Sequence, residues 1–140
     1  MSEEEAQQLL HQMQILESHF ADFTQRENTL MNVLKDTTSA IESLKGIGEK
    51  KESDTLVPLG MGTFVKTKIS SDEKIVLNVG AGVAIEKDKN SAINILESRI
   101  KEIEVALRDT IAQKRDVTSK LEQGKAEMNR LVESMSKAKK

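Results

Sequence analysis

The feature that most constrains the fold is a stripe of apolar residues that recurs at alternating steps of three and four. In the first part of the chain the stripe comprises Ala6, Leu9, Met13, Leu16, Phe20, Phe23, Glu27, Leu30, Leu34, Thr37, Ile41 and Leu44. Between Ala6 and Leu44 there is no proline or glycine, and only Glu27 and Thr37 break the apolar pattern. Apolar a and d positions sustained over this many heptads predict a coiled-coil helix rather than an ordinary globular one.

A second stripe with the same spacing occupies the last third of the chain. Its members are Ile93, Leu96, Ile100, Ile103, Leu107, Thr110, Lys114, Val117, Leu121, Gly124, Met128, Leu131, Met135 and Ala138. Thr110, Lys114 and Gly124 interrupt it. A helix of about 45 residues would be about 65–70 Å long. Propensity alone does not stabilise such a helix in water, so it needs a partner along its length.

The middle of the chain has a different composition. Six of the seven glycines and the only proline, Pro58, lie between Gly46 and Gly82. The segments between them are short and rich in β-branched residues, and they predict strands over 56–59, 63–69, 74–79 and 83–87. Two Gly-x-Gly motifs mark the reversals of two tandem hairpins, because tight reversals demand positive φ. Pro58 cannot donate to a ladder, which predicts an edge position for the first strand.

Together these segments predict an α+β fold. We expect a long antiparallel coiled-coil hairpin with two β-hairpins inserted between its helices, divided into residues 1–48, 49–90 and 91–140. Opposite charge supports the pairing, since residues 1–51 carry a net charge of −4 and residues 89–140 a net charge of +4. Two registers are compatible with the stripes. The preferred one places Glu27 opposite Thr110, and a shift of one heptad places Phe20 opposite Gly124.

The predicted strands carry apolar side chains on both faces. A monomer cannot bury both faces of so small a sheet. Isolated hairpins are marginal in water and their edges invite other strands. We therefore predict that strand pairing joins several chains here into a closed or barrel-like sheet. The alternative is a self-contained sheet capped by the bases of the helices. The expected assembly residues are Leu56, Val57, Leu59, Phe64, Val65, Ile69, Ile75, Leu77, Val79, Val83 and Ile85.

Several classes of function lack support in the composition. The chain has no cysteine, which excludes disulfides, thiolate metal sites and a cysteine nucleophile. The absence fits either a reducing compartment or indifference to redox, and we expect a cytoplasmic protein. A net charge of −2 argues against nucleic-acid binding, and no apolar run predicts a membrane span or signal peptide. Neither Gly-x-Gly motif matches a phosphate-binding loop, and His11 and His19 lack a third ligand nearby. We expect no enzyme activity, metal or cofactor.

The motifs of the middle segment resemble those of a known family. The stretches LVPLGMGTFVKTKI and KIVLNVGAGVAIEKD, each between long helices, are similar to the alpha-type subunits of prefoldin, also called the GimC complex. The presence of two hairpins rather than one points to the alpha class. Leu59 and Met61 stand where the family usually has smaller residues.

The resemblance implies that residues 1–140 form a single prefoldin-type domain. It also implies a hexamer of two alpha and four beta subunits, whose hairpins build a double-barrel platform carrying six coiled-coil tentacles. Unfolded polypeptide would be held between the tentacle tips, without nucleotide, and passed to a group II chaperonin. The tip would comprise about the first 15 and the last 15 residues.

The residues at the free ends of the two stripes suit a surface that holds non-native protein. Leu10 and Val132 fall on e positions, outside the stripes, and methionine adapts to varied apolar partners. The expected client-binding residues are Leu9, Leu10, Met13, Met128, Leu131, Val132 and Met135. The plainer alternative is that most of them only pair the helices. The alternative function is a structural coiled-coil tether that docks one fixed folded partner.

Overall fold

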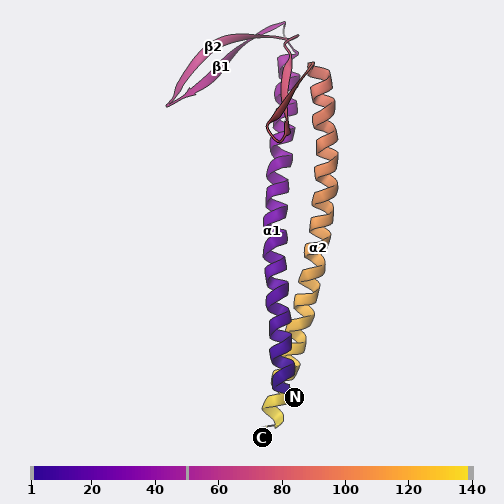
Figure 1. Cartoon of the computed structure of the whole chain (residues 1–140). Helices are drawn as coiled ribbons and strands as arrows, with labels where there is room; N and C mark the ends of the chain where they lie inside the picture. Colours follow the sequence, from indigo (N-terminus) through magenta and orange to yellow (C-terminus); the bar gives the residue numbers. More distant parts are fainter. Residues whose placement is uncertain (1, 50, 139–140) are drawn as a thin grey trace. The chain divides into compact units, whose positions relative to one another are not determined.

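The fold consists of two long helices separated by two antiparallel β-hairpins (Figure 1). The structure, a computed structural model, describes residues 2–49 and 51–138. The elements in chain order are α1 (Ser2–Ile47), β1 (Glu52–Gly60), β2 (Thr63–Ser70), β3 (Ile75–Gly80), β4 (Val83–Lys87) and α2 (Lys89–Ala138). The predicted α+β class and order of elements are confirmed.

The element boundaries follow local hydrogen bonding. β1 begins at Glu52, four residues earlier than predicted, because its polar first half pairs with the end of β2 through Glu52 opposite Ser70. α2 begins directly after Asp88, whose Oδ1 accepts a hydrogen bond from the Ser91 amide at 2.7 Å. This is an N-cap, and the bond from Ser91 lowers the pKa of the Asp88 carboxyl below its ordinary value.

Both stripes predicted from the sequence are the sides that the helices bury. Every stripe residue of α1 is buried or half-buried, and so is every stripe residue of α2 except Ala138, which is exposed. His11 and His19 are exposed on α1. The stripes therefore account for the packing of each helix, as the heptad spacing predicts.

The contacts divide the chain into two compact units. Unit 1 combines residues 1–32 with residues 104–140, and unit 2 comprises residues 33–103. That the chain acts as one domain stays a prediction. The core of unit 2 draws on both helices and on β3, and its buried members are Ile41, Leu44, Leu77, Ala92 and Leu96.

The β3–β4 hairpin is built into that core by one face. Leu77 and Ile85 lie opposite each other in the ladder, with Leu77 only 6% exposed, whereas Val76 on the other face is 64% exposed. Arg99 of α2 donates a hydrogen bond from Nη2 to the Asn78 carbonyl at 3.3 Å. The buried face of this hairpin therefore fits the alternative considered above, in which the bases of the helices cap the sheet.

The β1–β2 hairpin leaves both faces of its outer half uncovered. Val57 and Val65 pair on one face and are exposed, and Leu56 and Phe64 are exposed on the other. Ser53 and Thr55 of β1, and Ile69 and Ser70 of β2, are the half-buried members of these strands. In the described chain β1 has β2 as its only strand neighbour, in agreement with the edge position expected for Pro58.

Both hairpins reverse through the same turn. Gly60, Met61 and Gly62 have φ values of 109°, 51° and 73°, and the matching values at 80–82 are 102°, 53° and 76°. Positive φ at both central residues is typical of a type I′ turn, and the register shift just before it marks a bulge. The predicted positive φ at the glycines is confirmed, and the central Met61 and Ala81 share it at some cost.

Candidate functional site

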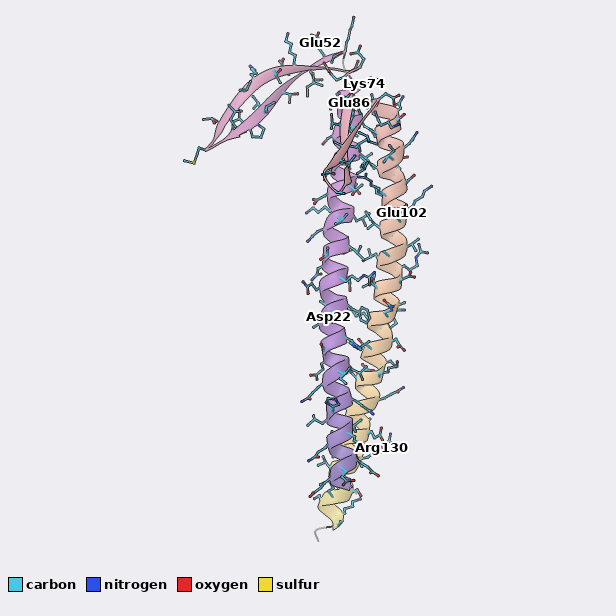
Figure 2. The ribbon with its side chains drawn as sticks, in the orientation of Figure 1. Asp22, Glu52, Lys74, Glu86, Glu102 and Arg130 are labelled. Carbon is cyan, nitrogen blue, oxygen red and sulfur yellow. The ribbon has the colours of Figure 1, made fainter. Side chains whose placement is uncertain are left out.

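The free ends of the helices in unit 1 contain the residues expected to hold clients. Leu10 is 51% exposed and Val132 is 55% exposed, so both e-position side chains stand outside the stripes as predicted from the heptad. The remaining candidates lie in the stripe: Leu9, Met128, Leu131 and Met135 are half-buried and Met13 is buried. Figure 2 draws the side chains of both helices and labels two exposed residues of unit 1, Asp22 of α1 and Arg130 of α2.

A close approach between the helices fixes their register in unit 1. Gly124 is buried, and a Cβ added to it would lie 3.0 Å from Cγ of Met13. The absence of a side chain at Gly124 therefore makes the space in which Met13 lies. This pairing agrees with the preferred register, in which Glu27 is level with Thr110, and not with the shifted one, in which Phe20 would face Gly124.

Polar side chains form one layer within the stripe of unit 1. Nζ of Lys114 lies 3.2 Å from Oε2 of Glu27 and 5.1 Å from the centroid of the Phe20 ring. Thr110 is buried, and its hydroxyl donates to the Ala106 carbonyl at 2.8 Å. Each charge at an a position thus has a partner, which is how a coiled coil tolerates such residues and fixes its register.

The pairing of Glu27 with Lys114 does not follow from the heptad positions. Counting level positions puts Glu27 opposite Thr110, whereas the long lysine side chain reaches about one helical turn along the axis. The sequence did contain one signal for this pairing, because the α1 stripe includes an acidic residue, Glu27, and the α2 stripe includes a basic one, Lys114.

The expected assembly residues fall into two groups. Ile75, Leu77 and Ile85 pack into the core of unit 2, and Ile69 is half-buried. The others are exposed; these are Leu56, Val57, Leu59, Phe64, Val65, Val79 and Val83. Met61, at the tip of the first hairpin, is also fully exposed, and the expected set did not include it. The exposed group gathers mainly on β1 and β2, so most uncovered apolar surface of the strands belongs to that hairpin.

Neither a metal-binding cluster nor a membrane-spanning helix occurs in the part of the chain that the structure describes. Within residues 2–49 and 51–138, no group of three or more His, Asp or Glu side chains could hold a metal ion. Over the same residues, no helix combines the length and the apolar character that crossing a bilayer requires.

Comparison with known proteins decides the family. The model of the prefoldin subunit family matches residues 3–134. The chain belongs to the prefoldin family. It is 59% identical to the prefoldin subunit alpha of Nitrosopumilus maritimus over 138 residues, which cover 99% of this chain and 95% of the relative. It is 33% identical to the prefoldin subunit alpha of Pyrococcus horikoshii, covering 76% of this chain and 73% of the relative. These similarities support an alpha-type prefoldin subunit.

Solved prefoldin structures share the fold. A filamentous prefoldin from Methanocaldococcus jannaschii superposes with a TM-score of 0.69 at 20% identity, covering 81% of this chain and 95% of that chain. The prefoldin beta subunit from Thermococcus strain KS-1 gives a TM-score of 0.65 at 17% identity, covering 90% of each. Prefoldins are chaperones rather than enzymes, and their subunits assemble with other prefoldin subunits.

Proposed function

We propose that this chain is a subunit of an ATP-independent holdase. It captures unfolded or nascent polypeptides with the free ends of its coiled coil and passes them to a group II chaperonin. The single observation that carries the proposal is the exposure of Leu10 and Val132 at e positions near those ends. Neither side chain is needed in the stripe, so both are available to apolar segments that a folded protein would bury.

The rest of the end region suits clients of varied sequence. Met13, Met128 and Met135 lie in this part of the stripes, and methionine side chains adapt to differently shaped apolar partners. Helix ends leave backbone groups without intrahelical partners, so the last turns open most easily. Opening there would add Leu9 and Leu131 to the surface offered to a client.

Assembly is the second part of the proposal. We assign the exposed side chains of β1 and β2 to contacts with beta-type prefoldin subunits, in a hexamer of two alpha and four beta subunits joined by a barrel-like platform. The support is an outer half that is apolar on both faces, with Val57 and Val65 on one and Leu56 and Phe64 on the other. Covering such surface is what strand pairing with other chains achieves.

The test uses the full chain co-expressed with a single-hairpin beta-type subunit. The complex should suppress aggregation of several unrelated denatured proteins without nucleotide, and Leu10→Ser with Val132→Ser should raise the amount of complex required several-fold. The matched control is Ile15→Ser with Val105→Ser, two exposed apolar residues of unit 1 outside the e positions. Unchanged suppression by the first double variant would contradict the client-binding role, and suppression limited to one folded partner would favour a tether.

A further inference from the structure

A second pair of exposed apolar side chains lies on the same flank of unit 1 as Leu10 and Val132. Met31 and Ile111 each directly follow a d position, as do Leu10 and Val132, and both are exposed. In an antiparallel helix pair, equivalent heptad positions of the two helices lie on the same side of the stripe. The register fixed by Met13 against Gly124 places Ile111 between Thr24 and Met31 along the axis.

Positive charge borders this pair on one side. Arg108 and Arg115 lie three and four residues from Ile111, so they are its neighbours on the surface of α2. Both are exposed, and neither makes an ion pair with a residue that the structure describes. On α1, Asn28 lies three residues before Met31 and is exposed and uncharged. One carboxylate also borders the pair, because the exposed Glu104 lies one heptad before Ile111 on the same flank and four residues before Arg108. Met31, Ile111, Arg108 and Arg115 together are named the flank patch.

We infer that the flank patch is a second client contact, which binds an extended non-native segment carrying carboxylates beside its apolar side chains. This inference rests on the proposed holdase function and names the class of segment that the coil prefers. Arg108 and Arg115 outnumber the neighbouring Glu104, so the flank patch keeps an excess of positive charge that complements carboxylates, while Met31 and Ile111 take up the apolar side chains.

Spacing on α1 supports an extended occupant. Leu10 and Met31 are separated by three heptads, or about 31 Å along a helix. An extended chain covers that distance in about nine residues. One unfolded segment can therefore contact the helix ends and the flank patch together, and the second contact lengthens its residence by making rebinding intramolecular.

The other exposed apolar residues of unit 1 provide a control. Ile15 and Val105 are exposed to a similar degree, but they occupy c and f positions on different sides of their helices. Each stands singly, which is normal for a protein surface. Replacing them removes the same kind of side chain without touching the flank patch.

The first measurement reports contact directly. The chain has no cysteine, so a single environment-sensitive dye can be placed at Asn28→Cys beside the patch, or at Asp22→Cys on another face as a control. The probes are two peptides of equal length, Leu-Ser-Asp repeats and Leu-Ser-Lys repeats. In the complex with beta-type subunits, we expect the emission at position 28 to shift to the blue with the Asp peptide and to stay unchanged at position 22.

The second measurement is peptide affinity by fluorescence anisotropy. Wild type should bind the Asp peptide about tenfold more tightly than the Lys peptide, and Arg108→Glu with Arg115→Glu should reverse that preference. Met31→Ser with Ile111→Ser should lower the affinity for the Asp peptide about fivefold. The control, Ile15→Ser with Val105→Ser, should lower it less than about twofold. The charge control is Arg26→Glu with Arg130→Glu, which should keep the wild-type preference.

The outcomes separate this inference from the function on which it rests. If unfolded protein and both peptides bind equally well to wild type and to the Met31 and Ile111 variant, with no dye response at position 28, the flank patch is refuted and the holdase function stands. If wild type binds neither the peptides nor any unfolded protein, the holdase function fails and the flank patch fails with it.

Discussion

The two β-hairpins of this chain have the same turn and similar apolar content, yet they occupy different environments. β3–β4 buries one face in the core of unit 2, where Leu77 lies among residues of both helices. β1–β2 exposes both faces of its outer half, including Phe64 and Val65. The contrast distinguishes two environments within one insert: one hairpin packs into the core of its own unit, and the other leaves apolar surface exposed, which we propose is covered by further chains.

The largest effect should come from placing a charge on the buried face of β3. Leu77→Asp would put a carboxylate without a partner into the apolar core and should cost about 3–5 kcal/mol of the free energy of unfolding. Val76→Asp, one residue away on the exposed face, should change it by less than about 0.5 kcal/mol. Urea unfolding followed by far-ultraviolet circular dichroism measures both.

The same substitution in the other hairpin sharpens the contrast. Val65→Asp should leave the unfolding of the isolated chain close to wild type and weaken its complex with beta-type subunits in sedimentation velocity. Equal destabilisation by Leu77→Asp and Val65→Asp would show that the two hairpins do not differ in the way proposed.

A smaller effect should follow from strain in the two matching turns. Ala81 and Met61 have φ values of 53° and 51°, a region that disfavours β-branched side chains most. Ala81→Val should lower the stability of unit 2 by about 1–2 kcal/mol, because β3–β4 is part of its core. Met61→Val should strain its turn equally but leave the helical unfolding transition in place, since the outer half of β1–β2 packs on no core. Coincident shifts in thermal unfolding for the two variants would contradict this.

The smallest effect concerns the junction between β4 and α2. The hydrogen bond from Ser91 lowers the pKa of Asp88 in the folded chain, so the cap adds stability above the ordinary carboxyl pKa and loses it as the pH falls through the lower folded value. Asp88→Asn keeps a side-chain acceptor for the cap and removes this contribution to the pH dependence. The free energy of unfolding, measured from pH 7 down to pH 2, should therefore fall slightly less steeply for the variant than for wild type. A steeper fall for the variant would contradict the assignment.

Much of this fold follows from spacing alone. The heptad steps identify the buried side of both helices because a coiled coil repeats the same contact along its length, and the Gly-x-Gly motifs identify both reversals because few residues tolerate positive φ. The difference in burial between the two hairpins could not be predicted from residue spacing. Leu77 and Val65 occur in similar alternating strands, and only contacts with distant helix residues distinguish them.

The candidate site shows the same limit. Heptad position predicts that Leu10 and Val132 stand outside the stripe, and both are exposed. It marks Gly124 as an interruption that could face Phe20, whereas the side chain that lies against it is Met13, more than a hundred residues earlier in the chain. Likewise, Glu27 and Lys114 appear as two separate polar residues until the reach of the lysine side chain joins them.

The close fit of Met13 against Gly124 also governs how the reach of the coil can change over evolution or by engineering. Sliding one helix by a heptad would place Leu131 or Val117 level with Met13 instead of Gly124 and remove the space in which its side chain lies, so the alignment resists drift. Matching heptads added to both helices beyond the pair preserve every existing contact, whereas an addition to one helix alone leaves an unpaired overhang. The length of the helix pair, and with it the span of the proposed client-binding surface, is therefore adjustable in steps of about 10 Å, provided that both helices lengthen together.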